Sequence, residues 1–167
     1  RNTAHPETTD RKAENSKNTI TLSAHMNGRF VPLENVQDEA FSSKVLGEGA
    51  AIEPEEGKLY SPCDGKVEMV FDTGHAVSLV SENGCEILLH IGIDTVKLNG
   101  KFFKTHVSDG QEIHKGDLLI SFELDEIRKA GYQTTTPMII CNTDDYETVK
   151  IASAEHVTAG NKIIEIK

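Results

Sequence analysis

Two histidines, His75 and His90, lie on either side of Asn83-Gly84, which separates two stretches rich in β-forming residues. Asn-Gly between such stretches is the strongest short-range signal for a β-hairpin with a two-residue loop. An imidazole with one bare nitrogen is a good nucleophile at neutral pH, and a second imidazole beside it can donate a hydrogen bond to an incoming group. The spacing therefore predicts a site built on these two side chains.

The predicted hairpin register extends this site. With Asn83 and Gly84 as the whole loop, the facing pairs are Val77 with His90, His75 with Gly92, Thr73 with Asp94 and Phe71 with Val96. Diagonal neighbours such as His75 and His90 would then lie about 7–8 Å apart at the backbone. Thr73 could orient the second ring, and Gly92 leaves space beside His90. A slip of one residue would move the whole set to the other face of the sheet.

Three functions are compatible with this pattern. Phosphoryl transfer needs mainly positioning and charge stabilisation, which a nucleophilic imidazole with a neighbouring donor supplies. The pattern fits equally well a second interpretation, in which the two histidines are half-buried strand residues with no catalytic role. A zinc site with His75, His90 and Asp94 as ligands is the third, although neither His-Glu-x-x-His nor His-x-His occurs in the sequence.

Short apolar stretches of period two, separated by Gly, Asn or Asp, surround the hairpin. They are Ile20–Leu22, Lys66–Val70, Ala76–Val80, Ile87–Ile91, Leu118–Phe122, Met138–Cys141 and Lys162–Ile166. This pattern is typical of an all-β sandwich or barrel. Glu123–Ala130 has a helical pattern with Gly131 placed to end it, and Val36–Leu46 can hold a short helical turn. The sequence therefore predicts an all-β domain with one or two short helices.

Two internal similarities indicate that this domain has two related halves. Residues 23–30 resemble residues 61–67, and residues 106–113 resemble residues 156–163. Self-similarity of this kind is typical of repeated structural units. The histidine that begins each member of the second pair is therefore predicted to be a framework residue.

The composition excludes several classes of partner. The chain of 167 residues has 17 basic and 27 acidic side chains and a formal net charge of −10. Nucleic-acid and lipid-surface binders need clustered positive charge, so neither class fits. No apolar run approaches the roughly 20 residues of a bilayer span, and no secretory signal is visible. The cysteines, Cys63, Cys85 and Cys141, form no C-x-x-C pair, which favours a reducing, cytoplasmic location.

Residues 1–19 differ from the rest of the chain. Their only apolar side chains are Ala4 and Ala13, so they cannot bury enough surface to offset the entropy of ordering. We predict that they form a flexible polar linker. Residues 20–167 then carry 13 basic and 24 acidic side chains, a net charge of −11. Because the chain begins at Arg1 rather than Met, we expect one domain of a longer polypeptide.

The segment that follows the predicted loop resembles a phosphorylation-site signature. Gly84-x-x-Ile87-Leu88-Leu89-His90-Ile91-Gly92-Ile93-Asp94-Thr95-Val96 is similar to the signature of the glucose-class IIA domain of the bacterial phosphoenolpyruvate-dependent sugar phosphotransferase system. The resemblance covers residues 20–167 and includes Ala51-Ile52-Glu53-Pro54, Tyr60-Ser61-Pro62-x-Asp64-Gly65 and Thr136-Pro137. Leu98-Asn99-Gly100 and Ala130-Gly131-Tyr132 are most similar to the β-glucoside/sucrose/trehalose permease branch. In that branch the IIA domain usually ends a membrane permease that also contains IIB and IIC parts.

This resemblance implies a fold and a set of roles. The fold would be a β-sandwich or barrel of two related hybrid motifs. His90 would take a phosphoryl group on Nε2 from phospho-HPr and pass it to a cysteine of a IIB domain. His75 matches the partner histidine that steadies the phosphoryl group, and Thr73 matches the hydroxyl that orients His75. The resemblance implies no required metal or cofactor.

The resemblance also implies a docking surface for HPr and IIB. Asp38 and Asp94 match acidic positions that flank the site and would meet basic side chains of HPr. An acidic domain attracts a basic partner and speeds their encounter. The apolar positions of this surface would be Phe41, Val45, Leu46, Phe71, Leu88 and Val96.

Other functions share parts of the pattern. A IIA-like regulatory module of a sugar transporter outside the phosphotransferase system would have the same domain sequence. A lipoyl- or biotinyl-type carrier domain shares the turn at Val107–Asp117, but it needs a modified lysine at a hairpin tip, where this chain has Asn83-Gly84. The remaining histidines, His5, His25 and His114, lack acidic or metal-ligand neighbours at useful spacing and are expected at the surface or in turns.

Overall fold

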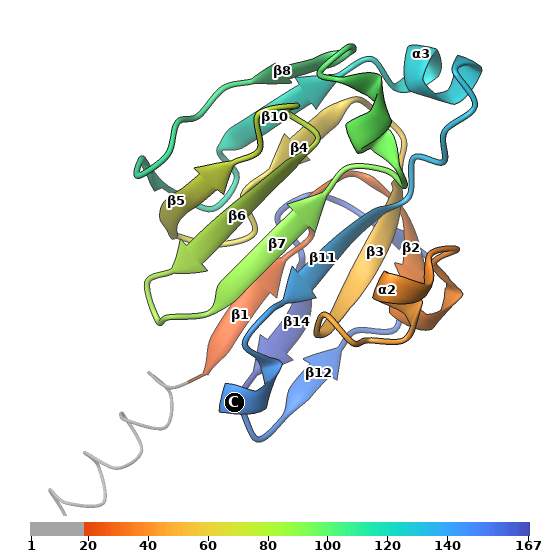
Figure 1. Ribbon diagram of the computed structural model, residues 1–167. Helices are drawn as coiled ribbons and strands as arrows, with labels where there is room; N and C mark the ends of the chain where they lie inside the picture. Colours follow the sequence, from red (N-terminus) through yellow and green to blue (C-terminus); the bar gives the residue numbers. More distant parts are fainter. Residues whose placement is uncertain (1–18) are drawn as a thin grey trace, which may run out of the picture.

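Short β-strands dominate residues 19–167, the part of the chain that the computed structural model describes. The α-helices in this part are α2 (Glu39–Ser42) and α3 (Leu124–Lys129), and the 3-10 turns are η1 (Leu33–Asn35), η2 (Thr95–Leu98) and η3 (Thr143–Asp145). The prediction of an all-β fold with one or two short helices is confirmed (Figure 1). The predicted linker, residues 1–19, lies outside the described residues except for Thr19. Within them, no helix is long and apolar enough to cross a lipid bilayer.

The largest sheet has eight strands. In spatial order they are β13 (His156–Val157), β2 (Gly28–Pro32), β3 (Glu48–Pro54), β11 (Thr136–Ile140), β7 (Glu86–His90), β6 (Ala76–Ser81), β5 (Gly65–Val70) and β9 (Glu112–Ile113). One smaller sheet has the order β1 (Ile20–Ser23), β14 (Lys162–Ile166) and β12 (Val149–Ile151). The other has the order β4 (Lys58–Tyr60), β10 (Leu118–Phe122) and β8 (Phe103–Thr105). All the pairings are antiparallel.

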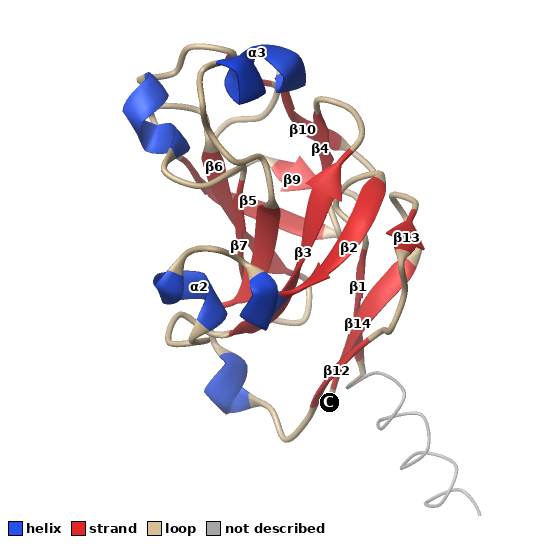
Figure 2. Ribbon diagram, turned by 90° about the vertical axis from the view of Figure 1, so that its right-hand side faces the viewer, coloured by secondary structure: helices blue, strands red, loops and turns tan. Residues whose placement is uncertain are grey.

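The three sheets enclose the main hydrophobic core. Leu22 from β1, Leu59 from β4 and Leu89 from β7 are fully buried in the same cluster. Burying one such side chain stabilises the fold by about 1.5–3 kcal/mol relative to leaving it exposed. Figure 2 shows β1, β14 and β12 as a layer beside β2 and β3. The sheets therefore form a sandwich, and its large sheet is a rigid support for the residues at its ends.

A second, smaller hydrophobic cluster lies on the other face of the large sheet. Its members are Val31, Leu33, Val36, Phe41, Ala51, Ile93 and Ile139, and η1 and α2 supply part of its cover. Along β3, Ile52 belongs to the main core and Ala51 to the second cluster. Strands buried on both faces lose the alternation of apolar and polar residues. For this reason the period-two pattern did not predict β3.

The first of the two internal similarities corresponds to repeated structure. Gly28 begins β2 and Gly65 begins β5. A Cβ atom on Gly28 would lie 2.1 Å from the Glu53 carbonyl oxygen, and one on Gly65 would lie 2.1 Å from the Val80 carbonyl oxygen. β2 also pairs with β13, at the start of residues 156–163, whereas β5 pairs with β9, at the end of residues 106–113, so the second similarity has no matching strand pairing. In each half, glycine permits the same close approach of two backbones.

The β6–β7 hairpin differs from its predicted register by one residue. Ala76, and not Val77, pairs with His90. The remaining observed pairs of the ladder are shifted by the same amount, so the predicted facing pairs are wrong. By strand alternation alone, the observed register would place the side chains of His75 and His90 on opposite faces of the sheet.

The loop of this hairpin has three residues instead of the predicted two. The Ser81 N–H donates to the Cys85 carbonyl at 2.9 Å, which leaves Glu82, Asn83 and Gly84 in the loop. Gly84 has a φ of +87°, and the φ of Asn83 is not positive. A type I′ turn would need positive φ at both central residues. Asn83-Gly84 therefore ends a three-residue loop in which the glycine alone is left-handed.

The prediction that His25 lies at the surface is wrong. His25 is fully buried, and its Nε2 donates to the Thr136 carbonyl at 2.8 Å. Burial lowers the pKa of His25 to about 4, against the opposing effect of that hydrogen bond, so the ring is neutral at pH 7. Its Nδ1 has no hydrogen-bond partner among the described residues. His114 is exposed as expected, and His5 lies outside the described residues.

Candidate functional site

His75 and His90 meet at one end of the large sheet because a tight turn carries His75 out of strand alternation. His90 is the last residue of β7, and His75 immediately precedes β6. The Phe71 N–H donates to the Ala76 carbonyl at 3.0 Å and the Gly74 N–H to the Phe71 carbonyl at 2.8 Å, with a φ of +69° at Gly74. The ring centroids of His75 and His90 lie 4.9 Å apart, with 81° between the planes. The turn, and not the predicted facing pairs, brings the two rings together.

The Gly92 carbonyl determines which nitrogen of His90 is bare. The Nδ1 of His90 lies 2.8 Å from the Gly92 oxygen. A carbonyl only accepts, so Nδ1 carries the proton of the neutral ring and Nε2 keeps its lone pair. Burial lowers the pKa of His90, and it outweighs the Gly92 hydrogen bond and the charges of Asp38 and Asp94, which raise it. At pH 7 the ring is therefore neutral, with a nucleophilic Nε2.

The Thr73 hydroxyl contacts Nδ1 of His75, as the Gly92 carbonyl contacts Nδ1 of His90. The Nδ1 of His75 lies 2.6 Å from the Thr73 hydroxyl. Burial, together with the neighbouring His90, lowers the pKa of His75 to about 4, so this ring is also neutral at pH 7. With the hydroxyl donating to Nδ1, the ring proton is on Nε2 and can be donated to a bound group. The two rings can thus have complementary tautomers, one offering a lone pair and the other a proton.

Two phenylalanines line the histidine pair. The Phe41 ring, from α2, lies 5.3 Å from the His90 ring between centroids. The Phe71 ring, from the turn before β6, lies 5.5 Å from the His75 ring and meets it edge-on. Apolar rings displace water, and a lower local dielectric strengthens electrostatic interactions with a bound group.

The two acidic residues, Asp38 and Asp94, flank His90 from different elements. Asp38 is the N-cap of α2, where its Oδ1 accepts the Ala40 N–H at 2.9 Å. Asp94 precedes η2 with a φ of +60°, a left-handed conformation in which Asp is more common than most residues. Both carboxylates raise the pKa of His90. The structure therefore places both of them within electrostatic reach of the ring.

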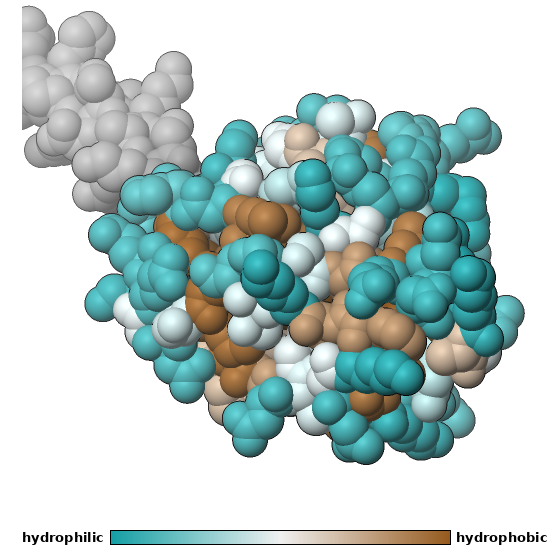
Figure 3. Space-filling model, turned by 90° about the horizontal axis from the view of Figure 1, so that it is seen from above, coloured by the Kyte–Doolittle hydropathy of each residue, from teal (hydrophilic) through white to brown (hydrophobic). Residues whose placement is uncertain are grey.

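The six residues of the expected apolar docking surface differ in exposure. Three are well exposed, namely Val45 at 77%, Val96 at 48% and Leu46 at 43%. The others are more enclosed, with Phe41 buried and Phe71 and Leu88 half-buried. Figure 3 shows, on one face of the molecule, apolar side chains reaching the surface in patches between polar ones. An approaching partner could contact Val45, Leu46 and Val96 without any rearrangement of the core.

The sequence indicated only that Gly92 leaves space beside His90, and it did not predict that the Gly92 carbonyl binds the ring. Gly92 has a φ of +72°, and a Cβ atom added to it would lie 2.7 Å from both the Gln133 oxygen and a methyl carbon of Thr95. The backbone can therefore present its carbonyl to His90 only when this residue is glycine. A glycine two positions after a histidine at the end of a strand was the available signal.

We expect Gly92→Ala to lower both the stability and the reactivity of the site. A left-handed alanine and the two close contacts should reduce the free energy of unfolding by about 1–3 kcal/mol. Gly110→Ala is a matched control, because Gly110 has a φ of +83° but no atom within 4 Å of an added Cβ. Chemical denaturation of both variants measures the difference. Equal losses of unfolding free energy in the two variants would show that the close contacts of the added Cβ at Gly92 cost nothing beyond the left-handed backbone.

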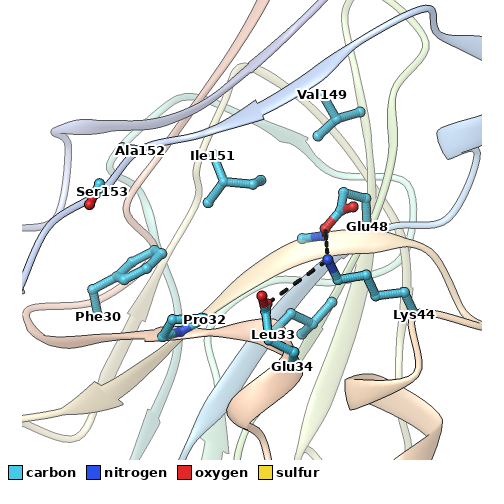
Figure 4. Close-up of a pocket in the computed structure, with 11 residues that line it drawn as sticks. Phe30, Pro32, Leu33, Glu34, Lys44, Glu48, Val149, Ile151, Ala152 and Ser153 are labelled. Carbon is cyan, nitrogen blue, oxygen red and sulfur yellow. Dashed lines mark hydrogen bonds and ion pairs between the residues drawn. The ribbon is translucent and has the colours of Figure 1, made fainter.

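A groove on another part of the surface lacks this chemistry. It has a volume of about 300 Å³ and is lined by residues of β2, β3 and β12 and their neighbours. Figure 4 shows Lys44 in this groove between two carboxylates, at 3.9 Å from Glu34 and 3.4 Å from Glu48. None of its lining residues is a histidine or a cysteine. The groove is therefore separate from the histidine pair.

The described residues provide neither a metal site nor an activated thiol. Between residues 19 and 167, no three His, Cys, Asp or Glu side chains are grouped so that they could hold a metal ion. The zinc alternative with His75, His90 and Asp94 thus finds no support. Burial is the main cause that raises the pKa of Cys63 to about 12 and that of Cys85 to about 11. These thiols remain protonated at neutral pH and are poor nucleophiles.

Comparisons with known proteins identify the family of this chain. Residues 20–146 match the model of the family described as phosphoenolpyruvate-dependent sugar phosphotransferase system, EIIA 1. The chain is 45% identical over 166 residues to the PTS system beta-glucoside-specific EIIBCA component of Halalkalibacterium halodurans. It is 44% identical over 154 residues to the PTS system glucose-specific EIIA component of Oceanobacillus iheyensis.

The coverage of these relatives differs. The alignment with the EIIBCA component includes 98% of this chain but only 26% of that relative's length, whereas the alignment with the EIIA component includes 92% of this chain and 93% of the relative. The fold is similar to that of glucose permease IIA from Mycoplasma capricolum, with a TM-score of 0.82 and 33% identity over 89% of this chain and 96% of that one. The chain belongs to the EIIA 1 family of the phosphoenolpyruvate-dependent sugar phosphotransferase system.

Proposed function

We propose that this domain is a phosphocarrier, in which Nε2 of His90 accepts a phosphoryl group from phospho-HPr and passes it to a cysteine of a IIB domain. The observation that carries the proposal is the hydrogen bond from His90 Nδ1 to the Gly92 carbonyl, with the His75 ring 4.9 Å away. Together these features provide a bare nucleophilic nitrogen and a neighbouring donor. Family membership supports the same conclusion.

The proposed transfer is a displacement at phosphorus. The lone pair of His90 Nε2 forms a new P–N bond while the P–N bond of the donor histidine breaks and its electron pair returns to the donor ring. Such reactions depend mainly on alignment and on stabilising the charge of the phosphoryl oxygens. The Nε2–H of His75, held in that tautomer by Thr73, would donate to one of these oxygens. In the second step the phosphoryl group leaves Nε2 for the thiolate of IIB.

Charge and shape support the proposed partners. Residues 20–167 carry a net charge of −11, and Asp38 and Asp94 flank the reacting ring. A donor with basic side chains around its own histidine would be attracted to this surface and oriented on it. The exposed apolar residues Val45, Leu46 and Val96 would lie under the partner and exclude water from the transfer.

The relatives also motivate a proposal about the whole polypeptide. Because one relative is named as an EIIBCA component, we infer that IIB belongs to the same polypeptide as this domain, at the cytoplasmic face of a membrane. In that arrangement the predicted linker would set the effective concentration of IIB around His90. The alternative, a regulatory module of another sugar transporter, would have the same domain without onward transfer to a cysteine.

The test is reconstitution with phosphoenolpyruvate, enzyme I and HPr. We expect phosphate uptake that requires HPr and places the phosphoryl group on Nε2 of His90. The linkage should be labile in acid and stable in alkali, and phosphorus–nitrogen coupling in NMR spectra identifies the nitrogen. Uptake without HPr, or phosphate on a residue other than His90, would contradict the proposal.

A further inference from the structure

The peptide that fixes the tautomer of His90 is itself supported by the loop between α3 and β11. The Ile93 N–H donates to the Gln133 carbonyl at 3.0 Å, and the Gly92 N–H points to the Thr136 hydroxyl at 3.4 Å. The Thr136 hydroxyl in turn donates to the Thr134 carbonyl at 2.9 Å. Figure 1 shows this loop running from α3 past the end of β7 into β11. The position of the Gly92 carbonyl therefore depends on where residues 133–136 lie.

The carboxylate of Glu53 accepts hydrogen bonds from two side chains of that loop. Glu53, on β3, accepts hydrogen bonds from Thr135 at 2.8 Å, from Arg128 at 2.8 Å and from Thr134. Arg128 also donates through Nε to the Thr134 hydroxyl at 3.1 Å and through Nη2 to the Pro54 carbonyl at 3.0 Å. We call Glu53, Arg128, Thr134 and Thr135 the Glu53 cluster. Its members come from β3, α3 and the loop, so it ties the loop to two regular elements.

The cluster differs from an ordinary surface ion pair. The side chain of Glu53 is only 24% exposed, and both of its oxygens accept hydrogen bonds. Burial raises the pKa of Glu53, but the hydrogen bonds from Thr134, Arg128 and Thr135 outweigh it and keep the pKa below its usual value. Hydrogen bonds to an ionised acceptor are roughly twice as strong as neutral ones. Glu53 therefore stays charged and holds its donors firmly.

Residues 131–135 belong to no strand or helix, so side-chain hydrogen bonds do much of the anchoring there. A continuous set of contacts leads from the Glu53 cluster through Thr134 and Thr136 to Gly92, and from the Gly92 carbonyl to His90 Nδ1. We propose that Glu53 is a positioning residue for His90, acting through the loop that supports the Gly92 peptide. The expected effect of Glu53 on phosphate uptake rests on the proposed function, whereas its expected effect on the His90 tautomer does not.

The first measurement is the tautomer of His90, read from the nitrogen chemical shifts of its ring in the unphosphorylated protein. In the wild-type protein we expect the Nδ1–H tautomer. In Glu53→Ala and in Thr134→Val the loop loses its central acceptor or its central hydroxyl, so the population of the Nε2–H tautomer should rise. Glu53→Gln keeps one acceptor oxygen but loses the charge and the second acceptor, so it should change the tautomer less than Glu53→Ala does.

The second measurement is the rate of phosphate uptake from phospho-HPr per folded molecule. A displaced or wrongly protonated nucleophile should lower this rate about 10-fold in Glu53→Ala and Thr134→Val. Glu126→Gln is the matched control, because Glu126 pairs with Lys129 at 3.3 Å on the same helix but has no bond to the loop. That variant should keep both the tautomer and the rate of the wild-type protein.

The two readouts separate the two proposals. If the wild-type protein takes up no phosphate, the proposed function fails, while the tautomer comparison still decides the role of Glu53. If Glu53→Ala and Thr134→Val lose stability but keep the His90 tautomer and the wild-type rate per folded molecule, the cluster only stabilises the fold and the positioning role is overturned.

Discussion

Replacing His90 with alanine is expected to lower phosphate uptake from phospho-HPr at least ~1,000-fold. The substitution removes the nitrogen that forms the P–N bond. His75 cannot replace it when the Thr73 hydroxyl donates to its Nδ1, because the proton of its neutral ring is then on Nε2. The initial rate of label transfer from phospho-HPr, corrected for the folded fraction, measures the effect.

A second histidine variant controls for the loss of an imidazole. His106 is exposed, and its Nε2 contacts the Ser121 hydroxyl at 2.8 Å rather than a residue of the histidine pair. His106→Ala should keep the wild-type rate. Because the His90 ring packs against Phe41, thermal unfolding should be recorded for His90→Ala as well. A folded His90→Ala protein that takes up phosphate at the wild-type rate would refute the assignment of the nucleophile.

Replacing His75 with alanine is expected to separate the two half-reactions. The variant should still accept phosphate, because the Gly92 carbonyl keeps Nε2 of His90 bare without help from His75. Onward transfer to the IIB cysteine should fall about 100-fold, since the donor that would stabilise the phosphoryl oxygens is lost. Single-turnover transfer from the phosphorylated variant to a IIB domain measures this step.

Thr73→Val tests the orientation of the same donor. It keeps the volume of the side chain and removes the hydroxyl that lies 2.6 Å from His75 Nδ1. We expect a smaller loss than in His75→Ala, in the same step of the reaction. Wild-type onward transfer in His75→Ala would mean that this histidine has only a packing role.

The hairpin shows how the proximity of two histidines can be predicted from an incorrect register. Asn-Gly suits both a two-residue loop and a three-residue loop that ends in a left-handed glycine, so the dipeptide alone does not choose between them. The choice depends in part on Asn142, which donates to the Gly84 carbonyl at 3.1 Å and accepts the Glu86 N–H at 2.9 Å. Residues more than fifty positions apart in the sequence thus set the loop.

The proximity of the two histidines has a different local origin. The sequence predicted it from diagonal neighbours in a ladder, whereas the turn at Phe71–Gly74 produces it. Thr73 was placed beside this pair for the same reason, and the structure does bring it to His75. The residue types and their spacing were therefore enough to predict which side chains lie together at the hairpin, but not the backbone geometry that brings them together.

Burial was harder to predict than chemistry. His25 lies between Ala24 and Met26, and all three are fully buried, so no alternation marks its position. Glu53 belongs to a motif shared with the resembling family, but its contacts could not be predicted, because its donors Arg128 and Thr134 lie more than seventy residues away. Contacts of this kind depend on how distant elements pack and leave no local pattern in the sequence.

The two hydrophobic clusters on opposite faces of β3 also imply a hierarchy of local stability. The main core joins all three sheets, whereas the second cluster holds only η1, α2 and the segment at Ile93 against one face. Small layers of this kind open at a lower free energy than the whole domain, and amide hydrogen exchange reports such openings. We therefore expect the Asp38 and Phe41 side of the histidine pair to belong to the more readily exchanging unit. Under the proposed function, that side would adjust to two differently shaped partners while the sandwich stays closed.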